Sequence, residues 1–190
     1  MDREYVEGAV VKNQNFSDKG FARGEYENCE FYDCVFSNAD LSESIFQNCD
    51  FHRCDLSMVK LHNTALRDVR FKECKQLGSR FDHCNKMLLS FSFHNCILNF
   101  SSFFALNLKG IIFKDCQMHE VDLVQAEMNN ACFKGSDLLH AMFDHTALEG
   151  ADFRDAVNFS IDPENNRIKK SKFSSNGLSG LLDKYNLQIE

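Results

Sequence analysis

The sequence predicts a solenoid, a rod in which short repeats stack coil upon coil. A large apolar residue recurs at every fifth position, and a small residue stands two places before it in most repeats. A period of five matches neither an α-helix, which repeats every 3.6 residues, nor a strand, which repeats every two. Such a chain has to turn at each repeat, burying one small and one large side chain and leaving three residues facing water.

The large apolar column runs through most of the chain. Stepping by five from Phe16 to Phe81, and again from Phe93 to Phe153, every position except Gln76 holds Phe, Leu, Met or Tyr. Eight of the nine cysteines fall in the small column: Cys29, Cys34, Cys49, Cys54, Cys74, Cys84, Cys96 and Cys116. Free cysteine packs as a small hydrophobic residue, so these positions are expected to be core.

Segments such as Cys49-Asp50-Phe51 and Ala151-Asp152-Phe153 show which residue types recur: a small residue, then Asp, then a large apolar residue. The pattern resembles the pentapeptide-repeat family over roughly residues 14 to 156. The resemblance implies an all-β fold, a right-handed quadrilateral β-helix with four pentapeptides per coil. Residues 20 apart would then stack, with Phe93, Phe113, Phe133 and Phe153 in one ladder, in a rod roughly 30 to 35 Å long.

We expect the β-helix to span residues 1–156, with an irregularity around residues 75–92. The spacing from Phe81 to Phe93 is twelve, and Gln76 puts an amide in a core position. This is either a tolerated defect or a projecting contact loop, since loops on rigid scaffolds often carry function.

Residues 157–190 are predicted to form a separate tail in which the repeat does not resume. Ile161-Asp162-Pro163 has turn chemistry, and a later apolar face at helical spacing predicts a short C-terminal α-helix. The tail resembles the dimerising C-terminal helix of Qnr and MfpA members of the family, although it could instead only cap the rod. The residues expected at the dimer interface are Leu178, Leu181, Leu182, Tyr185, Leu187 and Ile189.

Composition argues against several functions. The net charge of −7 at pH 7 disfavours direct nucleic-acid binding, which needs a basic footprint. The N-terminus has no signal-peptide pattern and no apolar run reaches membrane-spanning length, which predicts a cytoplasmic protein with no membrane partner. Nucleotide-binding and hydrolase motifs are missing, and the repeat explains the cysteines without zinc. We therefore expect no enzyme activity, no catalytic or metal-binding residues and no cofactor.

Charge is distributed in blocks. Residues 25 to 55 and 115 to 155 are rich in acids, whereas residues 60 to 86 form a basic belt. A charged face is usually just solvated, but an acidic rod of regular rise can also imitate the phosphates of a DNA duplex. The candidate partner-binding acids are Glu120, Asp122, Glu127, Asp137, Asp144, Glu149 and Asp152.

The resemblance implies which protein a DNA mimic of this kind would bind. Qnr-type and MfpA-type proteins look like DNA, form homodimers and bind a type II topoisomerase, DNA gyrase or topoisomerase IV, which they protect from fluoroquinolones. Two alternatives remain: a structural or interaction scaffold with an unknown partner, and immunity to a gyrase-poisoning peptide toxin.

Overall fold

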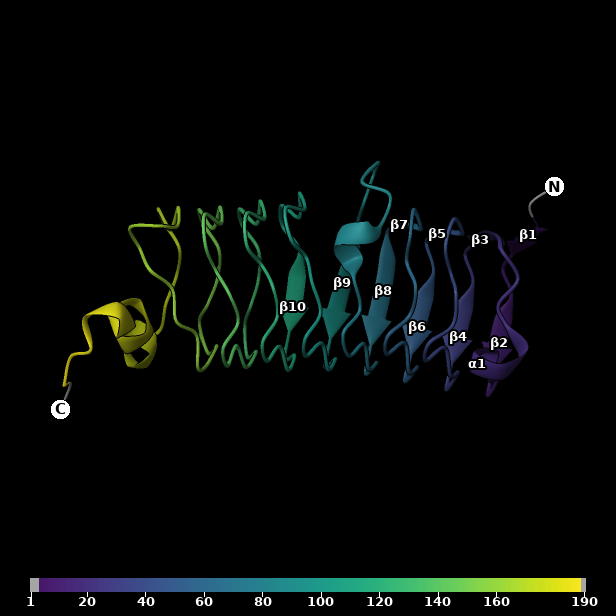
Figure 1. Ribbon diagram of the computed structural model, residues 1–190, viewed down its shortest axis with the longest axis horizontal. Helices are drawn as coiled ribbons and strands as arrows, with labels where there is room; N and C mark the ends of the chain where they lie inside the picture. Colours follow the sequence, from purple (N-terminus) through teal and green to yellow (C-terminus); the bar gives the residue numbers. More distant parts are fainter. Residues whose placement is uncertain (1–3, 189–190) are drawn as a thin grey trace.

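The computed structural model describes residues 4–188, which form a straight rod of parallel coils with the chain ends at opposite ends of the rod (Figure 1). Two parallel sheets run along it. One contains β1 (Glu4–Glu7), β3 (Gly24–Glu27), β5 (Ile45–Gln47) and β7 (Ala65–Arg67). The other contains β2 (Val10–Lys12), β4 (Glu30–Tyr32), β6 (Asp50–His52), β8 (Val69–Lys72), β9 (Phe91–His94) and β10 (Ile112–Lys114). The fold is the predicted pentapeptide-repeat β-helix.

Each coil has four sides, which we number in chain order. Side 1 carries β1, β3, β5 and β7, followed by the bridge ladder Asn107–Glu127–Ala147–Arg167. Side 2 carries the second sheet, followed by Ile112–Cys132–Asp152–Lys172. Side 3 is the ladder Asn15–Val35–Asp55–Lys75–Ile97–Gln117–Asp137–Val157. Side 4 carries the bridges Asp40–Lys60 and Arg80–Ser102–Asp122–Met142.

The core confirms the predicted 20-residue register. Phe93, Phe113, Phe133 and Phe153 are completely buried, and their rings stack in sequence with centroids 5.4, 5.4 and 4.7 Å apart. Stacked aromatic rings bury large apolar areas and hold each coil in register with the next. The ladder therefore fixes which outward-facing residues become neighbours.

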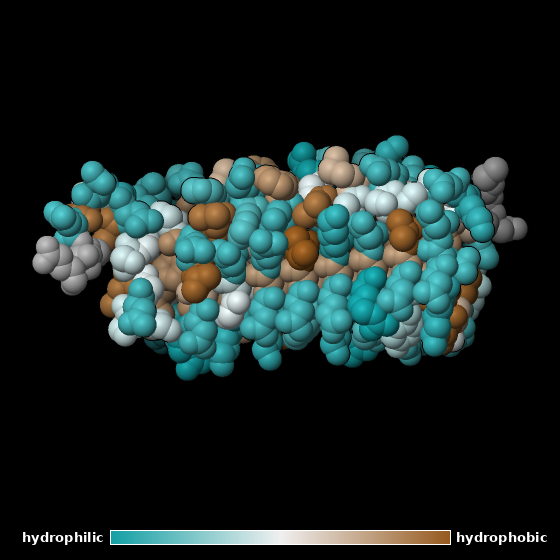
Figure 2. Space-filling view, turned by 90° about the horizontal axis from the view of Figure 1, so that it is seen from below, coloured by the Kyte–Doolittle hydropathy of each residue, from teal (hydrophilic) through white to brown (hydrophobic). Residues whose placement is uncertain are grey.

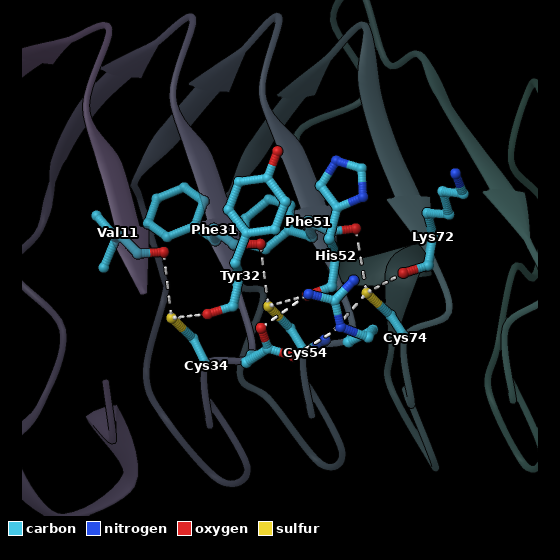
Figure 3. Close-up of polar contacts among 11 residues, drawn as sticks. Val11, Phe31, Tyr32, Cys34, Phe51, His52, Cys54, Lys72 and Cys74 are labelled. Atoms are coloured by element: carbon cyan, nitrogen blue, oxygen red, sulfur yellow. Dashed lines mark hydrogen bonds and ion pairs between the residues drawn. The ribbon is translucent and has the colours of Figure 1, made fainter. Parts of the chain in front are cut away.

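The small column contributes hydrogen bonds as well as volume. The thiols of Cys54 and Cys74 donate to the carbonyl oxygens of Phe31 and Phe51, 23 residues earlier, over 3.4 and 3.3 Å (Figure 3). Thr64 and Ser136 use their hydroxyls in the same way on other coils. These bonds tie neighbouring coils together inside the rod, in agreement with the prediction that the cysteines are core residues.

The corners between sides require an unusual backbone. The residue two places after the large apolar one has φ between about +50° and +65° in most repeats, as at Asn28 (52°) and Asp115 (54°). Asn, Asp and Gly adopt this left-handed conformation most readily. Corner residues are therefore a place where the fold constrains surface side chains.

The chain departs from the regular repeat within the range expected from the sequence, residues 75–92, but over a shorter stretch. The short 3-10 helix η1 (Phe81–His83) precedes it, and the chain then projects at residues 85–90, with Met87 and Leu88 exposed (Figure 1). The backbone N–H of Asn85 donates to the Thr64 carbonyl and that of Ser90 to the Leu66 carbonyl, so the loop leaves and rejoins its coil opposite two nearby residues of the preceding coil. Gln76 is buried, and its amide N and O have no hydrogen-bond partner.

The ladder extends at both ends beyond residues 14–156, over which the sequence resembles the repeat family. At the start, β1 and β2 add rungs in which Val6 and Val11 pack against the core. The helix α1 (Phe16–Lys19) follows them.

Beyond residue 156 the prediction that the repeat does not resume is wrong. Ile168 and Phe173 stand 20 residues after Leu148 and Phe153, and the Phe173 ring stacks on Phe153 at 5.1 Å. The ladder is only displaced at residues 157–161, where Phe159 and Ile161 are buried off the five-residue step.

The C-terminal helix forms, but as two 3-10 segments rather than an α-helix: η2 (Ser175–Leu181) and η3 (Asp183–Tyr185). Gly180 is buried against Phe159, and a Cβ on Gly180 would lie 2.2 Å from the Phe159 carbonyl oxygen. The Gly180 carbonyl also accepts the N–H of Ile161 over 2.9 Å. This close backbone contact fixes the segment across the end of the rod.

Candidate partner-binding surface

The C-terminal half of the rod presents two pairs of sides with different chemistry. Sides 3 and 4 comprise residues 96–105, 116–125, 136–145 and 156–165, which we name the acidic pair. Sides 1 and 2 comprise residues 106–115, 126–135, 146–155 and 166–175, which we name the mixed pair. Because each coil takes about twenty residues, alternate ten-residue segments of the chain stack on the same pair of sides.

The acidic pair contains no Lys or Arg within its four segments, all of which the structure describes. Its carboxylates are those of Glu120, Asp122, Asp137, Asp144, Asp162 and Glu164. The bases within residues 96–175 all lie on the mixed pair: Lys109, Lys114, Lys134, Arg154, Arg167, Lys169, Lys170 and Lys172. Folding therefore separates charges that alternate along the chain.

The structure divides the predicted acids between the two pairs of sides. Glu120, Asp122, Asp137 and Asp144 lie on the acidic pair, and Glu127, Glu149 and Asp152 lie on the mixed pair. The seven residues thus do not form one patch.

The three acids of the mixed pair have basic partners. Lys109 contacts Glu127 at 2.9 Å, Arg154 contacts Asp152 at 2.7 Å and Arg167 contacts Glu149 at 3.6 Å. Hydrogen bonds from Lys109 and Arg154 hold the pKa values of Glu127 and Asp152 below their ordinary values. Local cations offset the charge that these acids would offer to a partner.

Asp122, Asp137 and Asp144 on the acidic pair are held by neutral donors or histidine. Asp122 accepts the N–H of Val124 at 3.0 Å, and Asp137 accepts from Asn158 and His119, both at 2.8 Å. Partial burial acts to raise the pKa of Asp137, but the hydrogen bonds from Asn158 and His119 outweigh it and lower that pKa. Asp144 lies 3.0 Å from His145. Glu120 is exposed and has no ion-pair partner within residues 4–188.

Two acids of this surface, Asp162 and Glu164, were missed by the sequence analysis because they follow the expected end of the repeat. A 20-residue step from Asp144 would have found Glu164. Both carboxylates contact the ammonium group of Lys184 at 2.7 Å, and the Tyr185 hydroxyl donates to Glu164 over 3.2 Å. They belong to the attachment of the C-terminal segment as well as to the surface.

The N-terminal half lacks such a separation. Arg23, Arg53 and Arg70 form ion pairs with Glu43, Asp33 and Asp50, respectively, each pair lying 20 residues apart in sequence. The Arg70–Asp50 nitrogen–oxygen distance is 2.5 Å. Side 2 also stacks His52 on Tyr32, with ring centroids 4.7 Å apart (Figure 3). Of these arginines only Arg70 belongs to the basic belt, and it neutralises an acid of the preceding coil.

The residues predicted for a dimer interface fall into two groups in the C-terminal segment, one packed against the rod and one exposed. Leu181 packs against the core, whereas Leu178, Leu182, Tyr185 and Leu187 are exposed at the end of the rod. Ile189 lies outside the described residues.

Neither a metal centre nor a membrane-spanning helix is found among residues 4–188. No group of three or more His, Cys, Asp or Glu side chains there could hold a metal ion. The helices in this part of the chain are also too short and too polar to cross a bilayer.

Comparison with known families identifies the class of protein. A family described as a pentapeptide repeat region matches residues 25–91, and a family described as pentapeptide repeats matches residues 101–138 and 116–155. The chain belongs to the pentapeptide-repeat family.

Solved structures share its fold along the whole rod. A trypsin-treated R167E form of QnrB1, described as a plasmid-mediated fluoroquinolone resistance protein, is 17% identical, with a TM-score of 0.64. That match covers 98% of this chain and 100% of the trypsin-treated chain. Full-length QnrB1 is 16% identical with a TM-score of 0.58, over 98% of this chain and 100% of that one. A search of curated proteins found no match.

Proposed function

We propose that this protein binds a type II topoisomerase, DNA gyrase or topoisomerase IV, in the cytoplasm, and thereby protects the enzyme from fluoroquinolones. The acidic pair of sides would occupy the basic surface that otherwise holds DNA. The role is binding, with no catalytic step by this chain.

The observation that supports this proposal is the absence of Lys and Arg from the four stacked segments of the acidic pair. Successive coils are spaced at about 4.8 Å, so the carboxylates repeat along a stiff axis. A surface of one charge sign raises the association rate with an oppositely charged protein and disfavours other partners. The fold shared with QnrB1, a fluoroquinolone resistance protein, suggests which basic partner to test.

The test is DNA supercoiling by gyrase at a fixed, inhibitory ciprofloxacin concentration, with the purified protein titrated in. We expect supercoiling to recover as the protein approaches equimolar amounts. The same titration is made with topoisomerase IV and decatenation as the readout. No recovery with either enzyme would leave an interaction scaffold with another basic partner.

The active form in this proposal is a homodimer joined through the C-terminal segment. Leu178, Leu182 and Leu187 are exposed apolar side chains on a segment that is itself anchored to the rod by Gly180 and Lys184. Because the segment is already ordered, pairing of its apolar surface with a second copy would cost little further conformational entropy.

Leu182→Asp should give a monomer by sedimentation and abolish drug protection, because one rod presents half of the acidic length. Ser179→Asp, an exposed position on the same segment, is the matched control for added charge. A fully protective Leu182→Asp monomer would refute the dimer.

A further inference from the structure

The strongest unexplained feature of the surface is an apolar corner where sides 3 and 4 meet in the middle of the rod. Most exposed positions of this rod are polar, and Figure 2 shows hydrophobic residues dispersed among hydrophilic ones along one view of it. At this corner Met58 is 59% exposed and Phe100 is 57% exposed. Both are corner residues of the same column, in which Gly78 stands between them.

Both residues occupy a backbone position that disfavours them. Met58 has φ 55° and Phe100 has φ 63°. Residues other than Gly, Asn and Asp are uncommon in this left-handed region. Holding such a residue in this region strains the backbone. Exposing its side chain also forgoes the burial that normally stabilises an apolar residue. The fold itself asks for neither residue, because Asn stands at many other corners.

Gly78 makes the corner continuous. A Cβ at Gly78 would lie 2.6 Å from the Met58 sulfur, which shows that the Met58 side chain lies over the glycine. Ile97 on side 3 and Phe104 on side 4 are also exposed and belong to the same coil as Phe100. The corner is thus an apolar surface several side chains wide.

The acids at the Phe100 end of this corner favour a basic partner there. The coil that follows Phe100 brings Glu120 to the same corner column and Asp122 next to Ser102 on side 4. On the preceding coils, Lys75 lies beside Ile97 on side 3 and Lys60 follows Met58 on side 4, whereas Arg80 is paired with Asp82 at 2.7 Å. The Phe100 end of the apolar corner therefore lies on the acidic pair of sides, and the Met58 end lies next to the basic belt.

We propose that Met58 and Phe100 form an apolar anchor site for a protein segment that carries apolar side chains flanked by Lys or Arg. This inference rests on the proposed function, since it makes the anchor part of the topoisomerase-binding surface. DNA exposes no comparable apolar corner on its phosphate surface. The anchor therefore supplies affinity and specificity that charge mimicry does not, as exposed aromatic residues do at other protein interfaces.

The test is the double variant Met58→Asn/Phe100→Asn, because Asn tolerates the left-handed backbone and should keep the rod intact. Leu88→Asn is the matched control: Leu88 has φ 57° and is 72% exposed, but it lies on the loop at residues 85–90. We expect the double variant to bind gyrase or topoisomerase IV about tenfold more weakly, without a lower melting temperature, and the control to stay within about twofold. Equal binding by the double variant would overturn the inference and leave the proposed function standing.

A second probe separates the anchor from the identity of the enzyme. Binding is measured to a synthetic peptide of alternating Lys and Leu and to oligolysine of equal charge. The wild type should prefer the Lys/Leu peptide, and the double variant should lose that preference. If the wild type binds no topoisomerase but shows this preference, the anchor stands and the proposed function fails. If the wild type shows no preference for Leu, the anchor is wrong.

Discussion

The acidic pair and the mixed pair of sides are built on one core, yet they differ in how their charges are satisfied. On the mixed pair, Lys109, Arg154 and Arg167 pair with neighbouring carboxylates. On the acidic pair, Asp122 and Asp137 accept hydrogen bonds from backbone, amide and imidazole groups. The comparison teaches that counting acids does not locate an acidic surface; the coil period decides which charges meet.

The largest effect should come from breaking the core that holds the two pairs of sides apart. Phe133 is completely buried between the rings of Phe113 and Phe153. Phe133→Ala should lower the free energy of unfolding by about 3–5 kcal/mol, through lost burial and the cavity left behind. Denaturant unfolding measures it. A loss below about 1 kcal/mol would mean that the stack does not hold the rod together.

A smaller effect of opposite sign is expected from replacing Gln76. This substitution changes the core and leaves the charged surface as it is. The buried amide of Gln76 has no hydrogen-bond partner, and Leu has a similar volume. Gln76→Leu should raise the free energy of unfolding by about 1–3 kcal/mol, because an unsatisfied buried polar group is removed. Topoisomerase protection should not change.

Gln117→Leu, a substitution on the outer surface of side 3, is the control for Gln76→Leu and should change stability by less than about 0.5 kcal/mol. If Gln76→Leu destabilises the protein, the amide has a role that the packing does not reveal.

The smallest effect concerns pH. The pKa of Asp137 is lowered in the folded protein, so its ionised form stabilises the fold. That contribution is present above the unfolded pKa of about 4 and is lost as the pH falls through the lower, folded value. Asp137→Asn should therefore reduce stability at pH 7 and flatten its decline between about pH 5 and pH 2. Melting temperatures across that range test it, and parallel curves for the two proteins would exclude this role.

Much of the fold follows from the sequence, because a five-residue period leaves few alternatives. The Phe ladder, the buried cysteines and the irregular loop were all predictable from spacing. The continuation through Ile168 and Phe173 was hidden by the displaced step at Phe159, although a 20-residue comparison with Leu148 and Phe153 reveals it. The 3-10 geometry of the tail depends on Gly180 packing against Phe159, a long-range contact that helical spacing does not report.

The surface was only partly predictable. Which side an acid faces follows from its place in the 20-residue coil, so the split between Glu120 and Glu127 could be derived from sequence. Whether a Lys or Arg side chain pairs with that acid could not be derived from sequence, because the pairing depends on side-chain conformation, as for Lys109 with Glu127. The exposed corner at Met58 and Phe100 has a sequence signal, an apolar residue where a repeat otherwise carries a polar one.

The most direct test of the central claim compares two triple variants with the same change in charge. Glu120→Gln/Asp122→Asn/Asp144→Asn neutralises the acidic pair, and Glu127→Gln/Glu149→Gln/Asp152→Asn neutralises the mixed pair. Protection of gyrase from ciprofloxacin should need about tenfold more of the first variant and no more than about twofold more of the second. Equal loss in both would show that net charge alone is sensed, and loss only in the second would place the binding surface on the opposite sides of the rod.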